Sequence, residues 1–217
     1  MLAHFSEDEL LIDGFRRGDD IHARTAAEIF GVEPDAVTLE LRSAAKAINF
    51  GLIYGMSAFR LAGDLQISRG EAQQYMDTYF DRMPRVRGWL DETREFVRAN
   101  GYVETLFGRR RLIPEIYSKI FNERMGAERE AVNTRVQGTA ADLIKLAMLR
   151  VDAALEHQKR RTRIVLQVHD ELLLEVPREE LDAVRTLLSD EMTAAADLSV
   201  PLVVTTSDGL TWNEAHG

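Results

Sequence analysis

Residues 42–55, RSAAKAINFGLIYG, place a cationic or aromatic side chain at every fourth position. These stripe residues, as we call them, are Arg42, Lys46, Phe50 and Tyr54. An α-helix turns by about 100° per residue, so a four-residue step drifts by only about 40° and the four side chains share one face. A guanidinium and an ammonium suit a polyphosphate, and two rings suit a sugar and a base. The stretch therefore predicts a helix that binds a nucleoside triphosphate.

The stripe has a second explanation, and the composition admits both. Long cationic side chains often lie beside a half-buried helix face and keep their charges in water. The chain has 217 residues, 45% hydrophobic and 29% charged, which is ordinary for a globular protein with one large or two small domains. Because cysteine is absent, disulfides, thiol nucleophiles and thiolate metal sites are excluded.

Charge and hydropathy limit the choice of partners. No apolar run reaches the roughly 18 residues that span a bilayer, and no signal peptide precedes the first polar helix. We therefore expect no membrane association and a cytoplasmic location. The formal net charge of −9 argues mildly against a nucleic-acid partner. Basic clusters at 82–87, 109–111 and 159–163 nonetheless permit a polyanion.

Apolar periodicity and capping residues predict a chain that is helical through its first two-thirds. Capping boxes are expected at Ser6–Glu9 and Ser68–Glu71, and Pro84 is expected in the first turn of a helix. The expected helices are 6–15, 20–30, 38–54, 57–66, 68–82, 84–100, 122–157 (weakest at 137–139) and 179–195. The expected strands are 102–106, 109–113, 164–168, 172–176 and 200–205. This order predicts an α+β fold.

A second motif, QVHDE at 167–171, joins two of the expected strands. It places Asp170 and Glu171 at the tip of a hairpin, without the Asn-Gly or Asp-Gly pair that is usual in such turns. Carboxylates beside apolar strands need a compensating cation, and oxygen ligands suit Mg²⁺. The motif therefore predicts a magnesium site, with a solvated turn at a sheet edge as the alternative.

A third motif, in ERE-AVNTRVQGTAAD from residue 128, repeats the four-residue spacing with polar side chains. Arg129, Asn133 and Gln137 share one face of the expected helix. Such donors and acceptors can follow the minor groove of a duplex, whose acceptor pattern is similar for every base pair. The alternative is an ordinary polar outer face.

The three motifs occur in order with further matching stretches along essentially the whole chain. These stretches are GDDIHARTAAEIFGV, RSAAKAINFGLIYGMS, GYVETLFGRRRLIPEI, ERE-AVNTRVQGTAADLIKLAM and QVHDELLLEVP. In them the chain resembles the C-terminal part of a family A DNA polymerase, of the bacterial DNA polymerase I type. The resemblance implies a mostly helical fingers subdomain over 1–125. It implies the C-terminal part of the palm, with a small antiparallel sheet, over 126–217.

The resemblance also implies roles for the stripe and its surroundings. Arg42 and Lys46 would contact the incoming triphosphate, and His22 would assist at the phosphates. Phe50 would pack against the sugar and base, in the form that disfavours dideoxynucleotides. Tyr54 would close the helix on the nascent base pair.

The other two motifs receive roles at the DNA and the metal ions. The residues that would follow the primer–template minor groove are Arg129, Asn133 and Gln137. His169 would approach the primer terminus, and Asp170 would ligate the metals with Glu171 beside it. The implied reaction is template-directed DNA synthesis, in which dNTP is joined to a primer 3′-hydroxyl with two Mg²⁺ ions. Its expected catalytic residues are Asp170, Glu171 and Lys46.

One family motif, DYSQIELR, would lie immediately before the stretch MLAHFSEDEL that opens this chain. It supplies the first metal-binding Asp and the Glu that excludes ribonucleotides. We therefore expect a fragment, one piece of a split enzyme, or a decayed homologue, with negligible activity alone and the missing N-terminal polymerase portion as a partner. Asp208 and Glu214 are the acidic candidates to replace the lost Asp. The 167–171 hairpin would also keep an open strand edge, a site for pairing or aggregation.

Three other functions stay open. A single-subunit RNA polymerase would share the stripe, but it usually has Met at the position of Phe50 and Ser at that of Glu171. A non-catalytic module could bind nucleotide or primer–template DNA with the same helices. A purely structural helical protein would leave the three ordered motifs unexplained.

Overall fold

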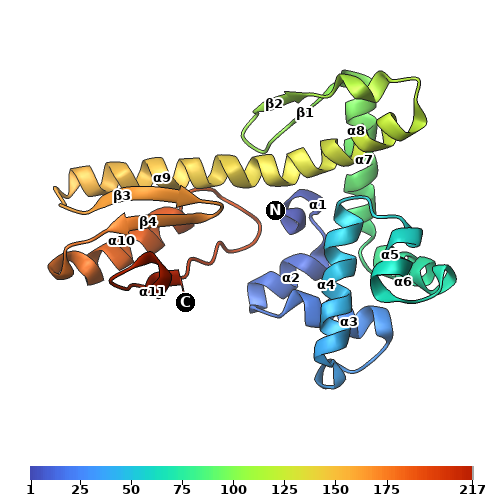
Figure 1. The fold of residues 1–217 in the computed structure, drawn as a ribbon, viewed down its shortest axis with the longest axis horizontal. Coiled ribbons are helices and arrows are strands. Elements are labelled where there is room, and N and C mark those ends of the chain that lie inside the picture. The colour runs from blue at the N-terminus through green and yellow to red at the C-terminus, as the bar shows by residue number, and fades with distance from the viewer. Residues whose placement is uncertain (217) are drawn as a thin grey trace. The chain divides into compact units, whose positions relative to one another are not determined.

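The computed structural model describes residues 1–216, and their contacts divide them into two compact units between Gln137 and Gly138. The first unit is helical apart from one short hairpin, and the second packs helices against another hairpin (Figure 1). This confirms the α+β fold class. Compactness alone does not separate polymerase subdomains, so the assignment of 1–125 to fingers and 126–217 to palm stays a prediction. No helix in the described part of the chain is both long and apolar enough to cross a membrane.

The first unit contains most of the helices. Its elements are α1 (Leu2–Ser6), α2 (Glu9–Arg17), α3 (Ile21–Phe30), η1 (Pro34–Ala36), α4 (Leu39–Ile53), α5 (Ala58–Leu65), α6 (Arg69–Arg82), α7 (Pro84–Asn100), β1 (Tyr102–Glu104), β2 (Arg110–Leu112), η2 (Pro114–Tyr117) and α8 (Phe121–Asn133). The two strands pair antiparallel from Tyr102↔Leu112 to Glu104↔Arg110, and each is shorter than expected.

One of the two predicted capping boxes is present. Ser68 and Glu71 form the expected reciprocal box, with Ser68 Oγ accepting from Glu71 N at 3.2 Å and Glu71 Oε2 accepting from Ser68 N at 2.9 Å. The predicted box at Ser6 and Glu9 is wrong. Ser6 ends α1, and the buried Asp8 caps α2 by accepting hydrogen bonds from Leu10 N and Leu11 N.

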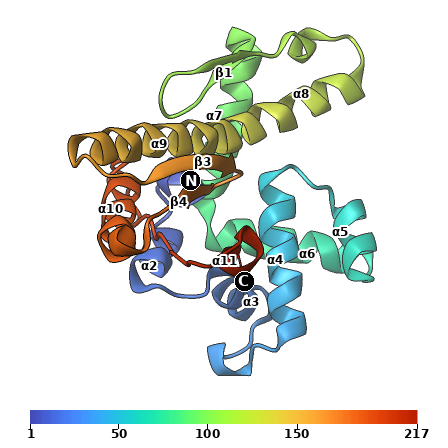
Figure 2. The same ribbon diagram turned by 60° about the vertical axis from the view of Figure 1, so that its left-hand side comes forward.

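Helix α4, which carries the stripe, packs its opposite face against α3, and the two lie side by side in Figures 1 and 2. The residues that α4 buries are Ala45, Ile48, Asn49, Gly51 and Leu52. The helix begins after Thr38, whose hydroxyl accepts from Leu41 N. It ends at Tyr54-Gly55, where Gly55 adopts a φ of 72° that favours glycine. The apolar contact with α3 leaves the stripe toward solvent.

Helices α7 and α8 enclose a second core with the β1–β2 hairpin. Its buried side chains are Val97, Val103, Ile113, Ile116, Ala127 and Ala131. Beyond α8 the backbone forms a π-helical turn at Thr134–Gly138. The weak point predicted at Gln137–Thr139 therefore overlaps a real irregularity, in which the helix changes its hydrogen-bond spacing without breaking.

The second unit consists of α9 (Thr139–His157), the antiparallel strands β3 (Arg163–Val168) and β4 (Glu171–Glu175), η4 (Arg178–Glu180), α10 (Leu181–Thr193) and α11 (Trp212–His216). Its core joins α9 and α10 through Val151, Leu155, Val184 and Leu187, with the partly buried Ile164, Leu172 and Leu174 of the hairpin packed against it. The helices thus cover one face of the hairpin.

The strand predicted at 200–205 is wrong. The described backbone there pairs with no other strand, and Val203 is 83% exposed. A strand requires a neighbour for its backbone groups, and alternation of apolar residues alone does not supply one. The short helix α11 that follows was not predicted.

Candidate active site

The stripe residues occupy the accessible side of α4 as predicted. Lys46 and Phe50 are exposed, and Arg42 and Tyr54 are partly exposed. Phe50 retains 47% of its surface in contact with water, which is unusual for a phenylalanine. An exposed ring next to the cationic stripe residues is available to a ligand, whereas a snorkelling face would bury its ring.

Asp20 holds the first stripe residue in place. Its Oδ2 accepts from Arg42 Nε at 2.6 Å, while its Oδ1 caps α3 by accepting from His22 N at 3.0 Å and Ala23 N at 3.1 Å. The bond from Arg42 holds the pKa of Asp20 below its ordinary value. Among residues 1–216 Nε is the nitrogen of this guanidinium that is paired, so its terminal nitrogens can bind an anion.

His22 completes the same cluster from α3. Its ring lies 5.7 Å from the ring of Phe50, and its Nδ1 is 3.1 Å from Nδ2 of the buried Asn49. Burial lowers the pKa of His22, with Arg42 and Lys46 lowering it further and Asp20 opposing them. The imidazole is therefore neutral at pH 7. The structure thus brings together four of the five residues predicted to bind nucleotide.

The end of the stripe contacts the third motif. A Cβ built on Gly55 would lie 2.8 Å from Cγ of Arg129, so the aliphatic part of Arg129 packs against this glycine. Arg129 is itself exposed. Two motifs predicted separately therefore meet inside the first unit, next to Tyr54.

The predicted face of Arg129, Asn133 and Gln137 is only partly regular. The α-helical step holds from Arg129 to Asn133, but the π-helical turn begins directly after Asn133 and contains Gln137. Asn133 Oδ1 is buried without a hydrogen-bond partner in the described structure, and Gln137 is exposed. Whether these side chains contact DNA stays a prediction.

Arg135, which the sequence did not single out, anchors the π-helical turn. Its Nη1 donates to Oγ1 of the fully buried Thr93 at 2.6 Å. Its guanidinium lies 5.1 Å from the ring centroid of Phe5 and 5.3 Å from that of Trp89. Burial lowers the pKa of Arg135, as expected for a cation removed from water.

The acidic hairpin of the second unit has a two-residue turn, since Val168 pairs with Glu171. His169 in that turn adopts a left-handed φ of 52°, and Gln167 Nε2 donates to the carbonyl of His169 at 2.6 Å. The unusual turn sequence is therefore accommodated by strain at His169 and support from Gln167. His169 and Asp170 are exposed at the tip.

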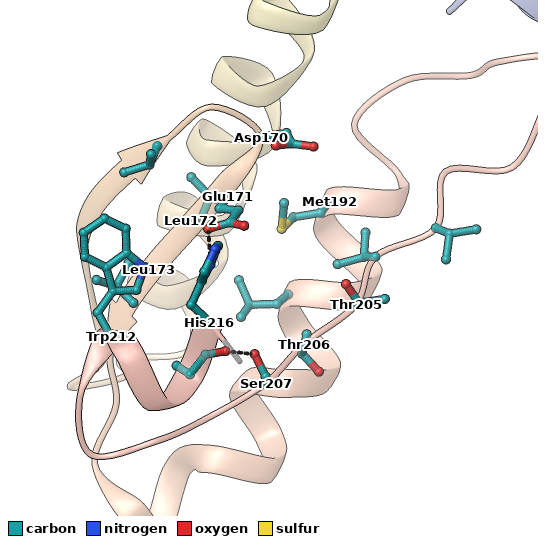
Figure 3. A pocket seen from close by; sticks show the side chains of 15 residues that line it. Asp170, Glu171, Leu172, Leu173, Met192, Thr205, Thr206, Ser207, Trp212 and His216 are labelled. Atoms are coloured by element: carbon teal, nitrogen blue, oxygen red, sulfur yellow. Dashed lines mark hydrogen bonds and ion pairs between the residues drawn. The ribbon is translucent and has the colours of Figure 1, made fainter. Parts of the chain in front are cut away.

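Glu171 and Asp170 have different surroundings, as Figure 3 shows. Glu171 Oε2 lies 3.3 Å from Nδ1 of His216 in α11. Both carboxylates border a cavity of about 380 Å³ lined by β4, α10, α11 and residues 203–207. Glu171 thus has a partner, His216, within the second unit, whereas Asp170 is exposed in the turn.

The donor set fits magnesium in one particular mode. Mg²⁺ is often held by one or two carboxylates together with substrate phosphates and water, and Asp170 and Glu171 supply two. Among residues 1–216 no group of three or more acidic or histidine side chains could hold a metal. The suggested replacements are engaged elsewhere, because Asp208 pairs with Arg185 and Glu214 Oε2 accepts from Leu210 N at 2.7 Å.

Six arginines of the basic clusters are paired with carboxylates. Arg82 pairs with Glu28 and Arg85 with Glu9. The same holds for Arg110 with Glu104, Arg111 with Glu130, Arg161 with Glu179 and Arg163 with Glu175. Surplus acid therefore neutralises much of the cationic sequence, in agreement with the net charge.

Comparison with known proteins identifies the family of nucleic-acid polymerases to which the chain belongs. Residues 1–214 match the model of DNA polymerase family A, and the chain belongs to this family. It is 51% identical to DNA polymerase I of Caldicellulosiruptor bescii over 214 residues and 49% identical to that of Pseudomonas aeruginosa over 216. These alignments cover 99% and 100% of this chain, but 25% and 24% of the relatives. The chain thus spans about a quarter of their length.

A solved structure gives the same result. The polymerase domain of Pol1 from M. smegmatis, in complex with DNA primer-template and dNTP, matches with a TM-score of 0.95 at 44% identity. The match covers 100% of this chain and 38% of that one. Family A DNA polymerases are metal-dependent enzymes, which agrees with the carboxylates at the hairpin tip.

Proposed function

We propose that this chain carries two parts of an enzyme for template-directed DNA synthesis. One is a nucleotide cradle, and the other is the acidic hairpin of β3 and β4. The cradle consists of His22, Arg42, Lys46, Phe50 and Tyr54. The observation that carries the proposal is the convergence of Arg42, Lys46 and the exposed ring of Phe50 on His22, in a member of DNA polymerase family A. The M. smegmatis domain was solved with DNA primer-template and dNTP, which supports both as partners here.

The cradle contributes by charge and orientation. Arg42 and Lys46 neutralise charge that builds on the leaving phosphates, and this electrostatic contribution is the largest the chain can make to phosphoryl transfer. Phe50 packs against the sugar and base. Tyr54, at the end of α4, closes on a correct base pair, which couples recognition to chemistry as induced fit.

The hairpin contributes the metal-binding carboxylates. Asp170 and Glu171 would hold Mg²⁺, which when bound polarises phosphate oxygens and favours ionisation of the primer 3′-hydroxyl. His169, exposed in the same turn, approaches the primer terminus. The third motif follows the duplex through Arg129, Asn133 and Gln137. Few other cations contribute to DNA binding, because many arginines of the basic clusters are paired with carboxylates.

Further polymerase segments complete the enzyme. The chain spans about a quarter of its relatives, and the described acidic residues give two carboxylates rather than three. We propose the N-terminal polymerase portion as the partner that supplies the rest, and the bacterial cytoplasm, where dNTP and chromosomal DNA occur, as the location. DNA rather than RNA is the product because the relatives are DNA polymerases.

Titration of magnesium-dATP tests the cradle. Lys46→Ala is expected to weaken binding to the 217-residue protein at least tenfold, since a hydrogen bond to a charged group contributes about 1.5–3 kcal/mol. Arg60→Ala is the matched control, because Arg60 is a highly exposed cation on α5 paired with Asp64. Equal affinity of wild type and Lys46→Ala contradicts the cradle.

Primer extension tests the need for further segments. The purified 217-residue protein is expected to extend a primer no faster than background. Extension well above background that is abolished by Asp170→Ala would show that this chain assembles a complete metal site by itself.

A non-catalytic module that binds nucleotide or DNA is the second candidate. It is favoured by the absence, among the described residues, of any cluster of three metal-ligating side chains. It predicts nucleotide binding together with no extension even after the N-terminal polymerase portion is added. Restored extension in that mixture distinguishes the enzyme from the module.

A further inference from the structure

We propose that Asn49 is a positioning residue that fixes the tautomer and ring orientation of His22, so that His22 Nε2–H donates to a phosphate oxygen. The inference rests on the proposed function for the identity of the ligand, but its structural part concerns only α3 and α4. Asn49 was not among the residues predicted from the sequence.

Asn49 is a polar side chain on the apolar face of α4. It is 6% exposed, with Ala45, Ile48 and Leu52 buried beside it. A buried amide costs free energy unless it is hydrogen-bonded. Asn49 Nδ2 lies 3.1 Å from His22 Nδ1 and 3.1 Å from Thr25 Oγ1, so both of its hydrogens have partners in α3.

Which group donates in each of these bonds follows from the hydrogen bond between Thr25 and the backbone carbonyl of Ile21. The backbone carbonyl of Ile21 can only accept, and Thr25 Oγ1 lies 2.7 Å from it. A hydroxyl has one hydrogen, so Thr25 donates to Ile21 and must accept from Asn49. Asn49 therefore donates from its NH₂ group to Thr25 at 3.1 Å, while its Oδ1 lies farther from that hydroxyl, at 3.4 Å.

The same NH₂ group faces His22 and determines its tautomer. Its second hydrogen points to His22 Nδ1, which must then be an unprotonated acceptor. In a neutral imidazole the proton is consequently on Nε2, at the ring edge away from Asn49. Burial and the neighbouring cations Arg42 and Lys46 keep the ring neutral.

This tautomer is the one that suits a phosphate. Nε2–H offers a donor to an anionic oxygen, whereas the other tautomer would present a lone pair and repel it. Phe50, with its ring 5.7 Å from that of His22, restricts the imidazole from a second side. Asn49, which is almost fully buried, thus acts on the ligand through His22.

Long-range ¹H–¹⁵N spectra of His22 at pH 8, without nucleotide, test the structural part. Wild type is expected to show Nε2 protonated and Nδ1 as a hydrogen-bonded acceptor. In Asn49→Leu the Nδ1 resonance is expected to move to the position of a free imidazole nitrogen, and in the control Asn100→Leu it should not move. Protonated Nδ1 in wild type, or identical spectra in wild type and Asn49→Leu, overturns the proposal.

A double-mutant cycle on magnesium-dATP binding tests the link to the ligand. Asn49→Leu is expected to weaken binding about tenfold in wild type and to have no effect in a His22→Ala background. The same loss in both backgrounds indicates a merely structural role and overturns the proposal. If wild type binds no nucleotide, the cradle itself fails, and the spectra alone decide the role of Asn49.

Discussion

The nucleotide cradle of the first unit and the acidic hairpin of the second are supported in different ways. In the cradle two of the five predicted side chains have a polar partner behind them, Asp20 for Arg42 and Asn49 for His22. At the hairpin tip Asp170 is exposed, and in the described part of the chain the turn is supported by the Gln167 bond and the His216 pair. A surface whose side chains are already held in place can bind a substrate without further segments, whereas an exposed carboxylate needs additional groups to form a site.

The contrast predicts that internal anchors of the first unit have the largest effect on stability. Arg135→Met is expected to lower the free energy of unfolding by about 2 kcal/mol, because it removes a charge-assisted hydrogen bond and two cation–π contacts. The variant no longer bears the cost of burying a guanidinium, and this offsets part of the loss. Urea unfolding in a Trp212→Phe background measures this, since Trp89 then reports on the first unit alone. A loss below that of the exposed Arg60→Met contradicts the anchor.

A smaller effect is expected at Asp20. Asp20→Ala should cost about 1.5 kcal/mol, roughly 1 from the helix cap and about 0.5 from the half-exposed pair with Arg42. Asp20→Asn keeps the cap and isolates the pair. Because the folded pKa is lowered, the contribution of the pair is present above the unfolded pKa of about 4 and is lost as pH falls through the folded pKa.

Unfolding in urea at pH 7 and near pH 2 checks this sign. The difference between wild type and Asp20→Asn should shrink at the lower pH. A difference that grows on acidification would mean that Asp20 is not stabilised as a carboxylate by Arg42.

The smallest expected effect has the opposite sign and lies in the hairpin. His169→Gly should raise the free energy of unfolding of the second unit by about 0.5 kcal/mol, because glycine adopts the left-handed φ of 52° without strain. Fluorescence of Trp212 in a Trp89→Phe background reports on this unit. Destabilisation instead would show that the His169 side chain stabilises the turn, and the hairpin would then resemble the cradle.

The sequence predicted the helices well because caps and apolar spacing are local signals. Thr38 and Gly55 bounded α4 to within a residue, and the stripe followed from the helix period alone. Segment 200–205 failed because strand formation depends on a distant neighbour. Ser6–Glu9 failed because Asp8, a third capping residue, competed for the same helix start.

Within the candidate site, the exposed residues were predictable and their supports were not. Asn49 carried a usable signal, since an amide among Ala45, Ile48 and Leu52 on an apolar face implies a buried hydrogen bond. Its partners could not be found, because pairing α4 with α3 requires the fold. Arg135 gave no signal, as an arginine in a polar helix is ordinarily solvated.

The π-helical turn at Thr134–Gly138 is in effect one surplus residue within an otherwise continuous helix. Shortening it by a single position would restore uniform winding and turn Gln137 to a new azimuth relative to Asn133. The spacing of that pair is therefore a tunable geometric variable. A one-residue deletion in this turn would therefore change the direction of the Gln137 carboxamide while leaving every neighbouring side chain chemically unchanged.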